Sequence, residues 1–261
     1  MSANISTILV IGATSGIGQA FTKHFHSKGK KIIAAGRRLD RLSALKSTHA
    51  GLETIQLDIE DITNLDTNLQ HILTTYPSLD SVFIAAGKMD LCDFKDPSTT
   101  QTKNIASEIT TNLTATISIA HTMIPHFISL KKPTTLITVS SGLAFIPVPY
   151  FPVYCATKAG IHSFSVTLRT QLADTNVNVL EVAPPYVATE LDTKFKERYI
   201  EAQGGADKAR VPISLEEYMA EVTGEFEKEG AKEVAVGFAK LGADAWRGTF
   251  GPILQNFGMK G

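Results

Sequence analysis

The chain has 261 residues, of which 43% are hydrophobic and 20% are charged, and its formal net charge is −1. This composition suffices for one large α/β domain and lacks the basic surplus that attracts nucleic acids or anionic membranes. Two cysteines, Cys92 and Cys155, cannot form a disulfide framework, and residues 1–11 show no basic, apolar leader. We therefore expect a cytoplasmic protein that binds neither nucleic acid nor a membrane.

The first predicted element is a strand over residues 8–11, a β-branched run typical of a strand buried on both faces. A glycine-rich turn with G-x-x-x-G-x-G spacing follows, and the pattern after it predicts a helix. Glycines permit a tight turn and close backbone approach, so the helix N-terminal amides can bind a pyrophosphate. Strand before and helix after are the context that supports dinucleotide binding. The candidate cofactor residues in this turn are Gly12, Thr14, Ser15, Gly16, Ile17 and Gly18.

The second predicted strand, residues 32–35, ends in Gly36-Arg37-Arg38. In a Rossmann unit an acidic residue near this position binds the 2′-hydroxyl of NAD, whereas arginine accommodates the 2′-phosphate of NADP. Gly36 takes the acidic position and two guanidinium groups follow, which favours NADP(H). The alternative is a solvent-exposed basic helix start, because Arg41 continues the run.

Later strands are predicted at 54–57, 82–85, 136–139 and 177–182, with helices over 62–75 and about 102–130. Strands that alternate with helices at this interval predict a Rossmann-type, doubly wound parallel sheet in a single domain, residues 1–261. Ligands of such sheets bind at the carboxyl ends of the strands. The residues expected to converge there are Gly12, Gly36, Asp58, Gly87, Ser141 and Pro184.

Tyr154 and Lys158 are four residues apart and share one face of a predicted helix. An ammonium near a phenol favours the phenolate, so we expect the pKa of Tyr154 to fall from about 10 toward neutrality. Such a tyrosine can exchange a proton with an alcohol or a nascent alkoxide near neutral pH. On its own the pair is also compatible with ordinary surface residues, and the surrounding motifs decide between the two.

With these motifs together, residues 7 to about 190 resemble the classical short-chain dehydrogenase/reductase family. The resemblance implies that Tyr154 is the acid/base and that Lys158 tunes it and holds the nicotinamide ribose. It further implies that Ser141 hydrogen-bonds the substrate oxygen and that Asn112 holds a relay water. The implied reaction is hydride transfer between NADP(H) and a carbonyl compound or secondary alcohol. Further cofactor contacts are implied at Asp58, Ile59, Ala86, Gly87, Val187 and Thr189.

The chain departs from the family pattern in three places. The N-N-A-G segment reads Ile84-Ala85-Ala86-Gly87, which removes polar side chains that brace the sheet. Pro184-Pro185 replaces Pro-Gly, constrains φ twice and should narrow the nicotinamide side. Beyond residue 200 we find no closing strand with its glycine pair, so the segment 190–261 is expected to form a substrate loop and an atypical helical end. The charged stretch 216–232 has a helical pattern, and the last twenty residues receive no assignment.

The remaining expectations concern ligands and assembly. The histidines show no spacing that would build a metal site with Cys, Asp or Glu, so no metal is expected. The long helix at 102–130 and the helix at Tyr154 are apolar over a wide arc, which in this family indicates a homodimer or homotetramer. The alternative functions are an NADP-binding redox sensor or scaffold without turnover, and an extended epimerase or dehydratase, although the latter would be longer. Aromatic residues predicted either as core or as the wall for an apolar or aromatic substrate are Phe145, Tyr150, Phe151, Tyr186, Phe195 and Tyr199.

Overall fold

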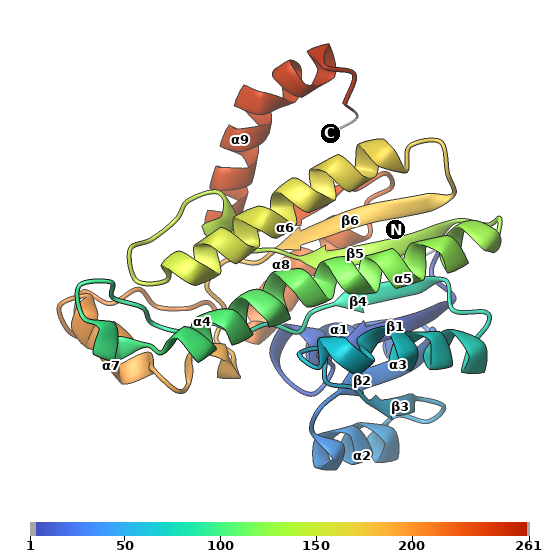
Figure 1. Ribbon diagram of the computed structural model, residues 1–261, viewed down its shortest axis with the longest axis horizontal. Coiled ribbons are helices and arrows are strands. Elements are labelled where there is room, and N and C mark those ends of the chain that lie inside the picture. The colour runs from blue at the N-terminus through green and yellow to red at the C-terminus, as the bar shows by residue number, and fades with distance from the viewer. Residues whose placement is uncertain (1–3, 260–261) are drawn as a thin grey trace.

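The computed structural model describes residues 4–259, and its centre is one sheet of seven parallel strands (Figure 1). The strand order is β3-β2-β1-β4-β5-β6-β7. All residues of β1 and β4 are buried, as expected for strands covered on both faces. In chain order the strands are β1 Thr7–Ile11, β2 Lys31–Gly36, β3 Glu53–Gln56, β4 Ser81–Ile84, β5 Thr134–Val139, β6 Val177–Ala183 and β7 Glu233–Ala235.

Helices cover both faces of this sheet and produce two apolar cores. One core joins α3, α5 and α6 to the sheet, and the other joins α1, α2 and α8 to the opposite face (Figure 1). This is the doubly wound, Rossmann-type arrangement that the alternating pattern predicted. The helices are α1 Gly16–Ser27, α2 Leu39–Thr48, α3 Ile62–Thr75, α4 Thr102–Ile109, α5 Ala115–Ser129, α6 Pro152–Gln171, α7 Lys196–Ala202, α8 Leu215–Phe226 and α9 Gly237–Asn256.

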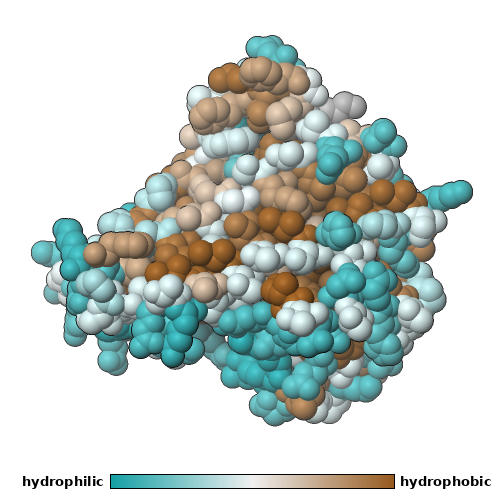
Figure 2. Space-filling view, in the orientation of Figure 1, coloured by the Kyte–Doolittle hydropathy of each residue, from teal (hydrophilic) through white to brown (hydrophobic). Residues whose placement is uncertain are grey.

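The long helix predicted over 102–130 is present but is interrupted. A π-helical turn, Thr110–Thr114, joins α4 to α5 and contains Asn112. Such turns insert an extra residue into a helix and occur frequently at functional sites. Three exposed isoleucines, Ile109, Ile117 and Ile128, lie along α4 and α5. Figure 2 shows apolar side chains gathered along α4, α5 and α6.

The prediction that the C-terminal segment lacks a closing strand is wrong. β7 pairs in parallel with β6, in the register Glu181↔Glu233 to Ala183↔Ala235. Three residues offer too little alternation to be recognised, and the charged residues before them hide the strand. Burial of Glu233 becomes possible because Arg247 from α9 lies 2.8 Å from its carboxylate.

The rest of the C-terminal segment is helical. The charged pattern at 216–232 corresponds to α8, which ends at Phe226 and buries Tyr218, Val222 and Phe226. The last residues, which received no assignment from the sequence, form α9 up to Asn256, and this helix projects from the body (Figure 1). Its first turns bury Ala239, Gly242 and Ala243, and a Cβ on Gly142 would lie only 3.0 Å from the Cα of Ala239. No helix within residues 4–259 is long and apolar enough to cross a membrane.

Candidate active site

The glycine turn between β1 and α1 lies against the end of β4. Gly12 has φ +90°, and a Cβ there would lie 2.6 Å from the backbone nitrogen of Ala86. A Cβ on Gly18 would lie 2.3 Å from the carbonyl oxygen of Gly12, so both positions require glycine. Ser15 precedes α1 and makes no side-chain capping hydrogen bond. The first amides of α1 are therefore available to an anion at the helix N-terminus.

A cluster of charged residues lies beside this turn. Arg38 donates hydrogen bonds to Thr14 Oγ1 at 2.9 Å and to Ser15 Oγ at 2.6 Å. Arg38 and Arg41 both bind the carboxylate of Glu190, at 2.9 and 2.7 Å. Hydrogen bonds from Arg41 and then Arg38 lower the pKa of Glu190. Arg38 thus lies where the sequence predicted a cofactor residue, whereas the participation of Arg41 and of Glu190 was not predicted.

Arg37, the other arginine predicted to meet the 2′-phosphate, points to a different neighbour. Its guanidinium lies 4.0 Å from Glu60 and its side chain is 57% exposed. Arg37 still lines the cleft described below, at the outer edge of the same end. The structure thus groups Arg38 with Arg41 more closely than with Arg37.

Tyr154 and Lys158 lie in the first part of α6, beside the end of β5. The hydroxyl of Tyr154 and Ser141 are joined by a side-chain hydrogen bond. Lys158 donates from Nζ to the carbonyl oxygen of Val139 at 2.8 Å, and Nζ lies 5.4 Å from the centre of the Tyr154 ring. Ser141 also caps a short 3₁₀ turn, because its Oγ accepts from the amide of Leu143 at 3.1 Å. The predicted trio is therefore assembled in one place.

The expectation of a lowered pKa for Tyr154 is wrong for the protein alone. Burial raises the pKa of Tyr154, and the hydrogen bond with Ser141 offsets this only in part. Burial also lowers the pKa of Lys158 to about 8. Both groups are thus shifted toward their neutral forms, since desolvation penalises charge on either one. The sequence could not supply this result, because spacing along a helix does not measure burial.

Asn112 lies behind this trio and does not line the cleft. Its side-chain amide accepts from the amide of Lys88 at 2.7 Å and donates to the carbonyl of the same residue at 2.8 Å. It also donates to Thr157 Oγ1 at 3.2 Å. Asn112 thereby ties the segment after β4 to α6. A Cβ on Gly87 would lie 3.4 Å from the Asn112 side chain and 3.8 Å from Lys158 Nζ.

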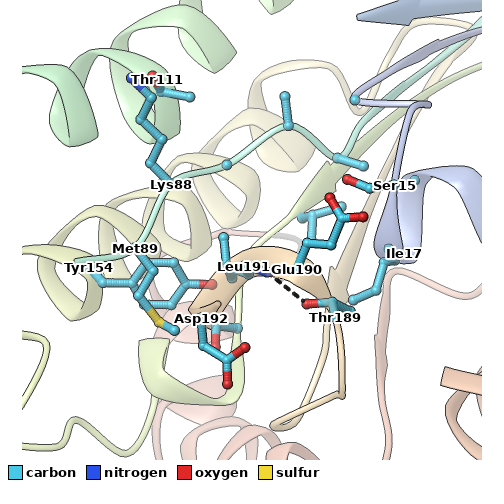
Figure 3. Close-up of a pocket in the computed structure, with 18 of the residues that line it drawn as sticks. Ser15, Ile17, Lys88, Met89, Thr111, Tyr154, Thr189, Glu190, Leu191 and Asp192 are labelled. Atoms are coloured by element: carbon cyan, nitrogen blue, oxygen red, sulfur yellow. Dashed lines mark hydrogen bonds between the residues drawn. The ribbon is translucent and has the colours of Figure 1, made fainter. Parts of the chain in front are cut away.

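Apart from Asn112, these groups surround one cleft of about 1100 Å³ at the carboxyl ends of the strands. Every predicted catalytic and cofactor residue except Asn112 lines it. Figure 3 shows Ser15, Ile17 and Thr189 toward one end and Tyr154 beside Met89 toward the other. Acidic and basic lining residues that the sequence did not single out are Lys88, Asp90, Glu108, Glu190, Asp192, Lys194, Arg198 and Arg210.

The predicted aromatic residues divide between wall and core. Phe151, Tyr186 and Tyr199 line the cleft. Tyr150 and Phe195 pack with them, the latter behind Phe151 with ring centres 5.5 Å apart. Phe145 packs instead against the ring of His162 in α6. The six rings therefore divide between the cleft wall and the packing behind it, and their contact with a substrate stays a prediction.

A buried charge cluster lies beside β6 and β7. His162 of α6 contacts the carboxylate of Glu181 at 3.0 Å and that of Glu233 at 3.9 Å. The sequence predicted no metal site and did not reveal this grouping, because the three residues come from separate elements. Arginines already bind the carboxylates, Arg169 that of Glu181 and Arg247 that of Glu233. We therefore describe the group as an ion-pair network that attaches β7 and α9 to the sheet.

Comparison with known proteins identifies the family. The family description "short chain dehydrogenase" matches residues 6–200. The chain belongs to the short-chain dehydrogenase/reductase family. An uncharacterized oxidoreductase of Bacillus subtilis, DltE, is 36% identical over 90% of this chain and 89% of its own length. Sulfoacetaldehyde reductase of Chromohalobacter salexigens is 31% identical over 70% of this chain and 73% of its own.

A solved member of the family has the same fold. The short-chain dehydrogenase of Sphingobium yanoikuyae, in complex with NADPH, superposes with a TM-score of 0.79 at 21% identity, covering 96% of each chain. By its family membership, the 261-residue chain is an oxidoreductase with the nucleotide-binding fold of the family. Members of this family bind NAD(H) or NADP(H). Its own residues fit such a cofactor. Glycines leave no side chain over the turn, the first residues of α1 line the cleft, and Arg38 lines it beside them.

Proposed function

We propose that the protein is an NADP(H)-dependent oxidoreductase that interconverts a small carbonyl compound and the corresponding secondary alcohol. The observation that carries this proposal is that Tyr154, Ser141 and Lys158 line the same cleft, with Lys158 one turn along α6 from Tyr154. The bound cofactor would supply the hydride chemistry.

Tyr154 is the proton donor in the direction of carbonyl reduction. Because burial raises the pKa of Tyr154, its hydroxyl retains its proton at neutral pH and is ready to give it to a developing alkoxide. Ser141, already bonded to that hydroxyl, orients it and can hydrogen-bond the same substrate oxygen. Lys158 adds a nearby charge that favours the phenolate left behind.

The other predicted residues hold the cofactor and the backbone around it. The glycine turn and the α1 amides bind the pyrophosphate, and Arg38 with Arg41 binds the 2′-phosphate of NADP. Asp58, Ile59, Ala86, Val187 and Thr189 also line the cleft. By resemblance to the family, the first three would contact adenine and ribose, and the last two would contact the nicotinamide amide. Asn112 positions the segment after β4 through its bonds to Lys88, and a relay water at Asn112 is part of the proposal.

The test is reduction of a panel of ketones, aldehydes and quinones by the purified protein with NADPH and, separately, NADH. Consumption of NADPH that requires a carbonyl compound supports the proposal. Binding of NADPH with no turnover of any compound would favour a redox sensor or scaffold instead.

A further inference from the structure

Glu108 on α4 is a buried carboxyl group for which the proposed reaction has no use. It lies one turn before Asn112, is 3% exposed and lines the cleft together with Tyr154. Within residues 4–259 its Oε1 has no hydrogen-bond partner, and the same holds for the buried hydroxyl of Thr111 three residues later. Buried polar groups without a partner are uncommon in native proteins, because desolvation is then not compensated. Two of them on one cleft wall indicate that this wall is built to contact a polar ligand.

A second carboxylate in the same cleft indicates that this ligand carries a positive charge. Asp90, in the segment after β4, is half-buried and lines the same cleft. Burial and then the charge of Asp90 raise the pKa of Glu108 to about 8. Both carboxyl groups line the cleft, and a cation bound between them would favour the ionised form of Glu108.

The cations already near Glu108 are engaged elsewhere. Lys158 donates to the carbonyl oxygen of Val139 at 2.8 Å. Lys88 binds Glu60 and the hydroxyl of Ser107. Both lysines lower the pKa of Glu108, yet it remains raised. Both lysines are therefore bonded to other groups, and the ionised form of Glu108 remains open to pairing with a cation that enters the cleft.

We propose that Glu108 and Asp90 bind a protonated amine of the substrate, so that the preferred substrates are secondary alcohols that carry an amino group and the matching amino ketones. This inference rests on the proposed function, because it places the amine in the cleft where Tyr154 meets the reacting oxygen. Glu108 is near enough to Tyr154 for its charge to raise the pKa of that hydroxyl. Amine and oxygen therefore belong to one small molecule, with the aromatic wall of Phe151 and Tyr199 covering its carbon skeleton.

The binding should depend on pH in a defined direction. A bound ammonium favours the ionised form of Glu108, so the KM of an amine substrate should fall as pH rises toward about 8. The KM of an uncharged substrate should not share this dependence. The titratable groups that interact with Glu108, from the segment after β4 and from α6, are Lys88, Asp90, Cys92, Tyr154, Cys155 and Lys158.

The experiment compares two alcohols that differ only in an ammonium or a methyl group, 1-amino-2-propanol and 2-butanol. The kcat/KM of each is measured with NADP⁺ at pH 8, alongside the reverse reaction of the matching ketones. We expect the native protein to prefer the amine by about tenfold or more, as is typical of a charge-assisted hydrogen bond. Glu108→Gln, which keeps the shape of the protonated acid, should reduce this preference about tenfold, and Asp90→Asn should reduce it as well. Asp93→Asn, an exposed carboxylate of the same segment, is the matched control and should retain it.

Each outcome separates this inference from the proposed function. Turnover of 2-butanol without a preference for the amine overturns the inference and leaves the proposed function intact. An amine preference that survives in both Glu108→Gln and Asp90→Asn also overturns it. If Glu108→Gln does not fold, as judged by its melting temperature, the Asp90→Asn ratio decides. Lack of turnover with every alcohol and carbonyl tested overturns the proposed function itself.

Discussion

Replacing Tyr154 with phenylalanine removes one oxygen atom from the centre of the proposed mechanism. The ring is 7% exposed and packs in a cluster with Phe151, Met89 and Leu143, which the substitution leaves in place. Because the substitution removes the hydrogen bond with Ser141 and retains this packing, the free energy of unfolding should change by about 0.5–1.5 kcal/mol.

Activity should respond far more strongly than stability. Loss of a general acid typically costs about 10²–10⁴-fold in turnover, which corresponds to roughly 2.7–5.5 kcal/mol of activation free energy. The assay is steady-state reduction of any active carbonyl compound with NADPH, together with cofactor binding followed by fluorescence. The kcat should fall and the NADPH affinity should stay nearly constant.

The structure offers a matched control for this substitution. Tyr150 lies four residues earlier, and its hydroxyl donates to the carbonyl of Ala202 at 3.3 Å without lining the cleft. Tyr150→Phe removes the same atom from the same residue type and should retain kcat within about threefold, because it breaks only a neutral hydrogen bond. A Tyr154→Phe protein with the kcat of the native protein would refute the assignment of the proton donor.

Three further predictions concern cofactor, acid stability and assembly. Arg38→Ala should weaken the binding of NADPH by about 1.5 kcal/mol and should affect the binding of NADH little. This value is the lower end for a bond to a charged group, because the Arg38 side chain is 40% exposed. Equal losses for both cofactors would contradict the assignment, and Arg37→Ala should have the smaller effect. Burial would raise the pKa of Glu181, but hydrogen bonds from His162 and its other partners hold it below the ordinary value, so its contribution to stability is present above about pH 4.5 and is lost as pH falls through its folded pKa; acid unfolding of Glu181→Gln should therefore be less steep in that range. Sedimentation at micromolar concentration should show a homodimer or homotetramer, and Ile117→Lys on the exposed apolar face should shift it toward monomer; a monomeric native protein would rule this out.

Much of the fold was predictable because its signals are local. Six strands were predicted from short runs rich in apolar or β-branched residues, although β3 is largely polar, and α3 was predicted at its observed bounds, 62–75. The glycine turn at Gly12 was likewise predictable, because the tight backbone approach there requires the absence of a side chain, which glycine itself provides. The three-residue β7 was missed because its burial depends on Arg247, fourteen positions later on another element.

The candidate site divides along the same line. Tyr154, Lys158 and Ser141 are marked by spacing within one helix and one strand end, so the sequence alone was enough to place them together. The pairing of Arg38 with Glu190, the burial of Glu108 beside Asp90 and the raised pKa of Tyr154 required the tertiary structure. Desolvation and the distance between charges on different elements decide these properties, and both are set only when the sheet and its helices have packed.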